Sequence, residues 1–85
     1  MHRTTERFWE RYARLPADVR DLADKSFHRL RENPRHPSLR FKKVGAFWSA
    51  RVGSGHRALA VEDGADFTWV WIGSHDEYDA IIRGR

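Results

Sequence analysis

The feature of this 85-residue chain that most constrains its fold is a run of three short segments in which apolar and polar residues alternate. The segments extend from Phe47 to Val52, from His56 to Val61 and from Phe67 to Ile72, with glycine-containing turns at 53–55 and 63–64. A period of two is typical of half-buried β-strands, and tight turns favour antiparallel pairing. A fourth candidate strand extends from Ser38 to Val44. We therefore expect a mainly antiparallel sheet of three or four strands.

The first 33 residues have helical periodicity instead. A first helix is expected to begin at Thr4 or Thr5, which are good N-caps, and to end at Pro16. A second helix is expected to end at Asn33-Pro34. Apolar residues recur at helical spacing in both segments: Phe8, Trp9, Tyr12, Leu15, Val19, Leu22, Ala23, Phe27 and Leu30.

The connection between the two helices is very short, which predicts an antiparallel helix hairpin. Helices followed by strands indicate an α+β fold, here a single domain spanning residues 1–85. We expect the hairpin to cover the sheet face that carries Trp48, Ala50 and Val52. Trp69 and Trp71, two residues apart, are expected on one face of a central strand, where at least one is core.

Composition narrows the function classes. The net charge of +4 and a pI near 10.1 favour anionic partners such as nucleic acid or an acidic protein. The absence of cysteine excludes disulfides, thiolate metal sites and cysteine nucleophiles. The histidines lack metal-ligand spacing, so no metal or cofactor is expected. No apolar run is long enough for a membrane span, and we expect a cytoplasmic protein.

The residues after the last strand form a helix-start motif. Ser74 and Glu77 fit a capping box, which predicts a short helix from there to about Arg83. His75 then lies in the first helical turn, and Tyr78, three residues later, shares its helix face. A histidine and a tyrosine beside a basic sheet are able to hold a phosphate and move protons. The same residues also fit purely structural roles, with His75 bonded to the sheet edge and Tyr78 packed inside.

The order of these elements and motifs resembles the RelE/ParE superfamily of bacterial toxins. Gly55 to Val61 has the family's strand pattern of glycine, arginine and hydrophobic residues, and Ile72 to Tyr78 reads Ile-Gly-x-His-x-x-Tyr. The resemblance implies a toxin of a type II toxin–antitoxin system, bound by a cognate antitoxin in a hetero-oligomer. For RelE-like members it implies mRNA cleavage on the ribosome, through attack of a ribose 2′-hydroxyl on the adjacent phosphate, and so inhibition of translation.

The resemblance also implies site residues. Arg57 and Arg51 match basic strand positions that clamp the phosphate, His75 falls where the family has an acid–base residue, and Tyr78 lies near its C-terminal tyrosine. RNA-binding positions add Lys42, Lys43 and Ser49, the last standing where RelE has a lysine.

Three alternatives stay open at the level of sequence. The first is the endoribonuclease, and the second is a ParE-like poison of DNA gyrase. The third is a binding domain that kept the fold and lost the chemistry. In each case an acidic antitoxin segment that folds on binding is expected to cover Arg51 and Arg57.

Overall fold

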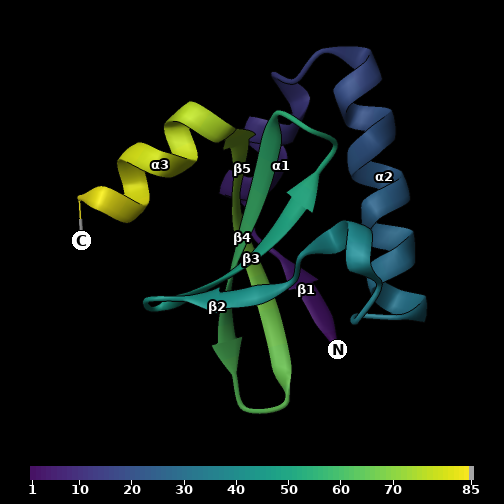
Figure 1. Ribbon diagram of the computed structural model, residues 1–85, viewed down its shortest axis with the longest axis vertical. Coiled ribbons are helices and arrows are strands. Elements are labelled where there is room, and N and C mark those ends of the chain that lie inside the picture. Colours follow the sequence, from purple (N-terminus) through teal and green to yellow (C-terminus); the bar gives the residue numbers. More distant parts are fainter. Residues whose placement is uncertain (85) are drawn as a thin grey trace.

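The computed structural model describes residues 1–84 and has the expected α+β architecture, with helices on both sides of one sheet (Figure 1). The elements in chain order are β1 (His2–Thr4), α1 (Glu6–Ala13), α2 (Ala17–Glu32), the 3-10 helix η1 (Pro37–Leu39), β2 (Lys42–Val44), β3 (Phe47–Val52), β4 (His56–Asp63), β5 (Asp66–Ser74) and α3 (His75–Arg83).

The sheet has five strands in the order β1-β5-β4-β3-β2, one more than the largest number expected. Strands β2 to β5 form the predicted antiparallel meander, whereas β1 pairs parallel with β5 and makes the sheet mixed. Strand β1 has only three residues, too few for an alternating pattern to be detected in the sequence. It is held at its start by the N-terminal ammonium, which lies 3.0 Å from the Asp66 carboxylate.

The segment expected to be a strand from Ser38 to Val44 is divided in two. Pro37 begins a 3-10 turn, and Arg40 ends it with a left-handed backbone conformation (φ 44°). Only Lys42–Val44 pairs with the sheet. The apolar side chain of Leu39, 1% exposed, is therefore buried from a helical turn and not from a strand.

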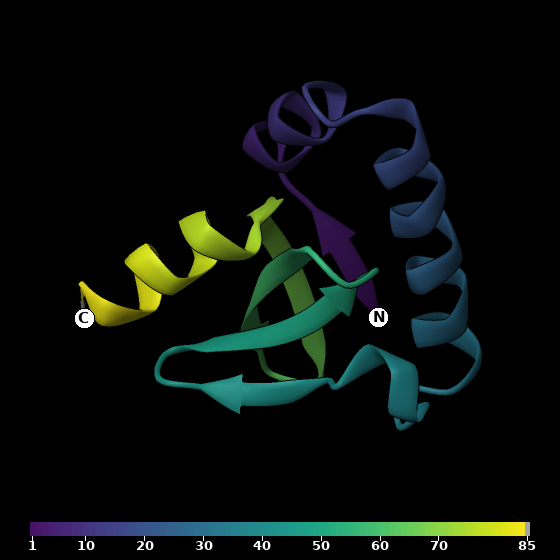
Figure 2. The same cartoon turned by 45° about the horizontal axis from the view of Figure 1, so that its top comes forward.

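The two N-terminal helices have the predicted starts and ends. The Thr5 hydroxyl caps α1 by accepting from the Phe8 N–H at 3.2 Å, and Pro16 immediately precedes α2. Figure 2 shows that the helices diverge from their short connection, because α1 packs against β5 while α2 packs against β3.

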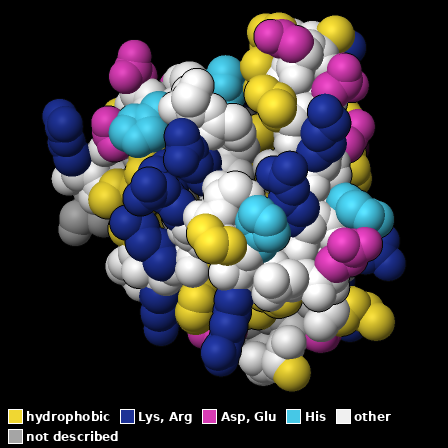
Figure 3. All heavy atoms as spheres, turned by 45° about the vertical axis from the view of Figure 1, so that its right-hand side comes forward, with side chains coloured by type: hydrophobic (Ala, Val, Ile, Leu, Met, Phe, Trp, Pro, Cys, Tyr) yellow, Lys and Arg dark blue, Asp and Glu magenta, His cyan; other side chains and the backbone are white. Residues whose placement is uncertain are grey.

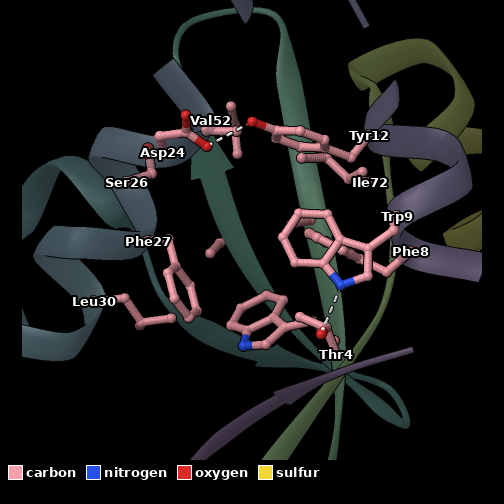
Figure 4. Close-up of a pocket in the computed structure, with 14 residues that line it drawn as sticks. Thr4, Phe8, Trp9, Tyr12, Asp24, Ser26, Phe27, Leu30, Val52 and Ile72 are labelled. Carbon is pink, nitrogen blue, oxygen red and sulfur yellow. Dashed lines mark hydrogen bonds between the residues drawn. The ribbon is translucent and has the colours of Figure 1, made fainter. Parts of the chain in front are cut away.

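The divergence leaves an apolar cavity of about 80 Å³ between α1, α2 and the sheet (Figure 4). The hydroxyl of Tyr12 donates to Asp24 Oδ1 at 2.7 Å and bridges the two helices at one end. Trp9, expected within the buried stripe, is 50% exposed and donates its Nε1–H to Thr4 Oγ1 at 2.9 Å. No helix within residues 1–84 is both long and apolar enough to cross a bilayer.

A register shift in the β4–β5 ladder places Trp69 and Trp71 in different cores, one on each side of the sheet. Leu59 pairs with Trp71 and Ala60 pairs with Trp69, so Val70 is the extra residue of a β-bulge. Trp69 therefore packs beneath α1 and α2, and Trp71 packs on the opposite side beneath α3. Both tryptophans are core, as expected, but they do not share a face, because the bulge reverses the alternation between them.

We predict that His2 makes stability depend on pH. Its Nδ1 accepts a hydrogen bond from Trp69 Nε1 at 3.1 Å, and its ring stacks on Phe67. Burial, the N-terminal ammonium and Arg31 lower the pKa of His2 below its ordinary value of 6.5. The unfolded chain then binds a proton that the folded chain resists, so stability falls as the pH drops below 6.5.

Urea unfolding at pH 7.5 and at pH 5.5, followed by tryptophan fluorescence, tests this. The free energy of unfolding should differ less between the two pH values in the His2→Gln variant than in the wild type, by roughly a few tenths of a kcal/mol. The effect is small because His2 is only partly buried. The matched control is His28→Gln, since His28 is exposed and pairs with Glu32 on the surface of α2. An unchanged pH dependence in His2→Gln contradicts this role.

Candidate active site

The junction between β5 and α3 is built by the predicted capping box. The Ser74 hydroxyl accepts from the Glu77 N–H at 3.2 Å, and Glu77 Oε1 accepts from the Ser74 N–H at 3.1 Å. The helix therefore begins at His75, whose N–H donates to the Gly55 carbonyl at 2.8 Å in the turn between β3 and β4. This turn and the start of α3 are held together, which brings His75 to the edge of the arginine-bearing strands.

Tyr78 connects the helix to the sheet. It is 7% exposed and packs with Leu59 and Trp71 in the core beneath α3. The centre of the Arg57 guanidinium lies 5.2 Å from the centroid of its ring, within the range of a cation–π contact. On the same ring the His75 imidazole lies 5.7 Å away, centroid to centroid. Arg57, Tyr78 and His75 are therefore consecutive neighbours, and we call them the contact triad.

The charge of Arg57 is not neutralised. Its NH1 donates only a long hydrogen bond, 3.5 Å, to Ser49 Oγ, and its buried Nε has no hydrogen-bond partner. Within residues 1–84, no carboxylate lies within 4.0 Å of the Arg57 guanidinium. A buried donor without a partner has a substantial free-energy cost. An anion that accepts from this guanidinium would remove part of that cost.

One ring nitrogen of His75 is held by Asp79, and the other is open. Its Nδ1 lies 3.2 Å from Asp79 Oδ2, one helical turn later, and its side chain is 45% exposed. When the ring is neutral, this contact requires the proton on Nδ1 and leaves the Nε2 lone pair free. Nε2 has no partner within the described residues, so it is available to a ligand. The acidic residue Asp79 thus fixes the tautomer.

Arg51 lies next to the contact triad without touching it. It is the cross-strand partner of Arg57, so both side chains leave the same face of the sheet. The Arg51 Nε donates to the Gly53 carbonyl at 2.8 Å, which turns the guanidinium toward the end of β3. Like Arg57, Arg51 has no carboxylate within 4.0 Å in the described part of the chain.

The three remaining predicted positions are separated by the sheet. Lys42 pairs with Ser49 and shares the face of Arg51 and Arg57, whereas Lys43 pairs with Trp48 on the opposite face. Ser49 is fully buried, so in this structure its hydroxyl supports Arg57 and is not presented to a ligand.

Basic side chains dominate one side of the surface. Figure 3 shows Lys and Arg side chains gathered near its centre beside histidine, with most of the acidic side chains toward its rim. Arg51 and Arg57 belong to the sheet, and Lys25 and Arg29 to the neighbouring helix α2. The long-range field of such a surface attracts anions.

Arg11 is a supporting residue that the sequence did not reveal. Its NH2 lies 2.8 Å from Glu77 Oε2, its Nε donates to the Ile72 carbonyl at 3.1 Å, and its guanidinium stacks over Trp71. The Ser74 backbone N–H, the Ser74 hydroxyl and Arg11 lower the pKa of Glu77, which is therefore ionised at neutral pH. The predicted capping residue thus also links α3 to α1.

Metal-ligating side chains do not cluster in the described part of the chain. No group of three or more His, Asp or Glu side chains in residues 1–84 is placed to hold an ion. The contact triad itself contains one imidazole, one guanidinium and one phenol. This set is suited to anion binding and proton transfer.

With this geometry established, the fold can be identified as that of the RelE/ParE toxins. No protein-family model and no curated protein matches the sequence. The chain is similar to several solved structures. The sequence identity is low, so this similarity applies to the fold alone.

Three of these structures illustrate the likeness. A chain of the RelB–RelE antitoxin–toxin complex from Methanococcus jannaschii has a TM-score of 0.72 and 14% identity, over 92% of this chain and 96% of that chain. The isolated RelE toxin of E. coli has a TM-score of 0.64 and 16% identity, over 100% and 98%. A YoeB/ParE toxin from Agrobacterium tumefaciens has a TM-score of 0.66 and 17% identity, over 87% and 96%.

We predict that Gly73 is required beneath the contact triad. Gly73 pairs with Arg57, and a Cβ at this position would lie 2.6 Å from the buried Trp71 ring and 2.9 Å from Glu77 Oε1. Gly73→Ala should therefore lower the free energy of unfolding by about 1–3 kcal/mol through overpacking. The matched control is Gly55→Ala, because a Cβ there meets nothing within 4 Å. Equal stability of the two variants in urea unfolding would refute the packing described for Trp71.

Proposed function

We propose that this chain is the toxin of a type II toxin–antitoxin system and that it cleaves mRNA on the ribosome. One observation carries the proposal. An uncompensated guanidinium, Arg57, contacts Tyr78, which in turn contacts an imidazole with a free Nε2, His75. The likeness of the fold to RelE and to chains from RelB–RelE complexes supports the toxin class.

The proposed reaction needs side chains of this protein and a water molecule that carries a proton. The ribose 2′-oxygen attacks the adjacent phosphorus, an O2′–P bond forms and the P–O5′ bond breaks. The products are a 2′,3′-cyclic phosphate and a 5′-hydroxyl, and no water is consumed. One proton leaves the 2′-hydroxyl, and one must reach O5′.

His75 and Arg57 have different roles in this reaction. Nε2 of His75 takes the 2′-hydroxyl proton, while Asp79 on Nδ1 stabilises the imidazolium that results. The Arg57 guanidinium donates to the phosphate oxygens, whose negative charge increases in the transition state. Tyr78 contacts both groups and in this way helps to orient the nucleotide. Water in the half-exposed site gives a proton to O5′, and the hydroxide that results takes the proton from the His75 imidazolium, which restores both the water and the neutral ring.

A cognate antitoxin is the expected protein partner. The chain carries a net charge of +4, and Arg51 and Arg57 are adjacent on one face of the sheet. An antitoxin segment with acidic residues that folds on this surface would neutralise the arginines and block access to them.

We predict that His75→Ala and Arg57→Ala each lower the rate of mRNA cleavage by about 10²–10⁴-fold, the range for one acid–base or charge-stabilising group. The measurement is primer extension on mRNA incubated with ribosomes and purified protein. His28→Ala is the control, since His28 lies on α2 and pairs with Glu32 at 2.9 Å.

Mapping transcript 5′ ends after induction in cells separates the nuclease from the other candidates. Intact mRNA in growth-arrested cells, with arrest retained by His75→Ala and DNA damage present, would reject the nuclease and favour a gyrase poison. Harmless induction of the wild-type chain would reject the toxin class as a whole.

A further inference from the structure

A second group of cations lies beside the contact triad and has no role in the chemistry above. Helix α2, η1 and the end of β3 enclose an open hollow of about 370 Å³. Three of its seven lining residues are cationic, namely Lys25, Arg29 and Arg51, and none is a carboxylate.

The two guanidinium groups are oriented but not neutralised. Arg51 Nε donates to the Gly53 carbonyl at 2.8 Å, so both of its terminal nitrogens remain available. Arg29 NH1 donates to Ser38 Oγ at 3.3 Å, and this hydroxyl lies 2.8 Å from His36 Nδ1. Each guanidinium is thus held by a neutral oxygen, and its positive charge faces the hollow.

The three cations that line the hollow repel one another. Lys25 and Arg29 are four residues apart on α2, where like charges repel. Arg51 adds a third positive charge from the sheet. Asp24, which precedes Lys25, lines the cavity between α1 and α2, where Tyr12 donates to it (Figure 4). Glu32, three residues after Arg29, pairs with His28. No ion pair within residues 1–84 includes any of the three cations.

We propose that Lys25, Arg29 and Arg51 form a second phosphate site, which binds the backbone of single-stranded RNA next to the phosphate that is cleaved. This inference rests on the proposed nuclease function. Arginine and lysine are the usual partners of backbone phosphates, and such contacts fix the register of a strand without reading its bases.

Arg51 makes the two sites continuous. It is the cross-strand neighbour of Arg57, and directly opposed residues have Cβ atoms about 5 Å apart. Helix α2 packs on the other face of the sheet, so a strand held at Arg57 would pass Arg51 at the edge of β3 that β2 leaves uncovered, and would then meet Arg29 and Lys25. The contact triad supplies the chemistry, and the second site supplies binding energy and direction.

RNA fits this hollow better than an acidic peptide does. A polynucleotide carries one negative charge on every residue, so one strand can satisfy Arg57 and the hollow together. Five of the seven lining residues are polar or charged, whereas a helix of a protein partner needs a floor of several large apolar side chains. Leu22 is the one large apolar side chain among the lining residues.

The test measures the affinity of the whole chain for a fluorescent 12-nucleotide RNA that carries 2′-O-methyl groups and cannot be cleaved. Fluorescence anisotropy is recorded over a series of salt concentrations. Lys25→Gln/Arg29→Gln is compared with Arg7→Gln/Arg14→Gln, which removes the same charge from exposed positions on α1 and its C-cap. Thermal melting checks that both variants fold.

We expect the α2 variant to lose at least tenfold in affinity at 0.1 M salt and the control to lose less than threefold. The salt slope of the α2 variant should become shallower by about 1.4, since each lost single-strand phosphate contact contributes about 0.7. A deoxydinucleotide, too short to reach the hollow, should bind all three proteins with equal affinity. Arg29→Lys, which keeps the charge, should retain most of the affinity.

Equal losses in the α2 variant and the control overturn the second site. Loss of affinity for an acidic antitoxin peptide, with RNA binding unchanged, also overturns it and assigns the hollow to the protein partner. Ribosomal cleavage assays on the same proteins separate this result from the proposed function. If the wild type cleaves mRNA but the α2 variant and the control bind RNA with equal affinity, the second site is rejected and the nuclease function is kept. If only the α2 variant loses RNA affinity and the wild type does not cleave mRNA, the nuclease function is rejected and the second site is kept.

Discussion

The β-bulge at Val70 is the constraint on which the rest of this structure depends. Without it, Trp69 and Trp71 would share one face of β5, and the other face would lack its largest apolar side chain. With it, Trp69 closes the core beneath α1 and α2, and Trp71 joins Leu59 and Tyr78 beneath α3. A 10.0 kDa chain gains stability by burying both sides of its sheet. The second core also fixes α3 where its first turn contacts the arginine-bearing strands.

The candidate site is where the chain departs from its most stable arrangement. Arg51 and Arg57 oppose each other across β3 and β4, although directly opposed like charges are unfavourable. Arg57 also keeps a buried Nε without a partner. Such departures are typical of binding sites, because a ligand supplies the missing interaction. The neighbouring carboxylates do not pair with the two arginines. Glu77 binds Ser74 and Arg11, and Asp79 binds His75.

The sequence predicted what depends on local pattern. Strands β3 to β5, both N-terminal helices and the capping box at Ser74 follow from periodicity and capping chemistry. The grouping of Arg57, His75 and Tyr78 followed from the family resemblance together with the predicted helix start. What depends on packing was not predicted. Strand β1 exists only because β5 pairs with it, the bulge is set by the two cores, and the hollow beside Lys25 and Arg29 is set by the position of α2 on the sheet.

The central claim is that one phosphodiester binds Arg57 and His75 together. NMR titration of the free chain with a deoxydinucleotide, which lacks the 2′-hydroxyl needed for cleavage, tests it most directly. The claim predicts that the Arg57 Nε–H and the His75 ring signals shift together with a single dissociation constant, while the signals of His28 on α2 stay fixed. Shifts at Arg57 and His75 with different dissociation constants, or no shift at either residue at millimolar ligand, would contradict it.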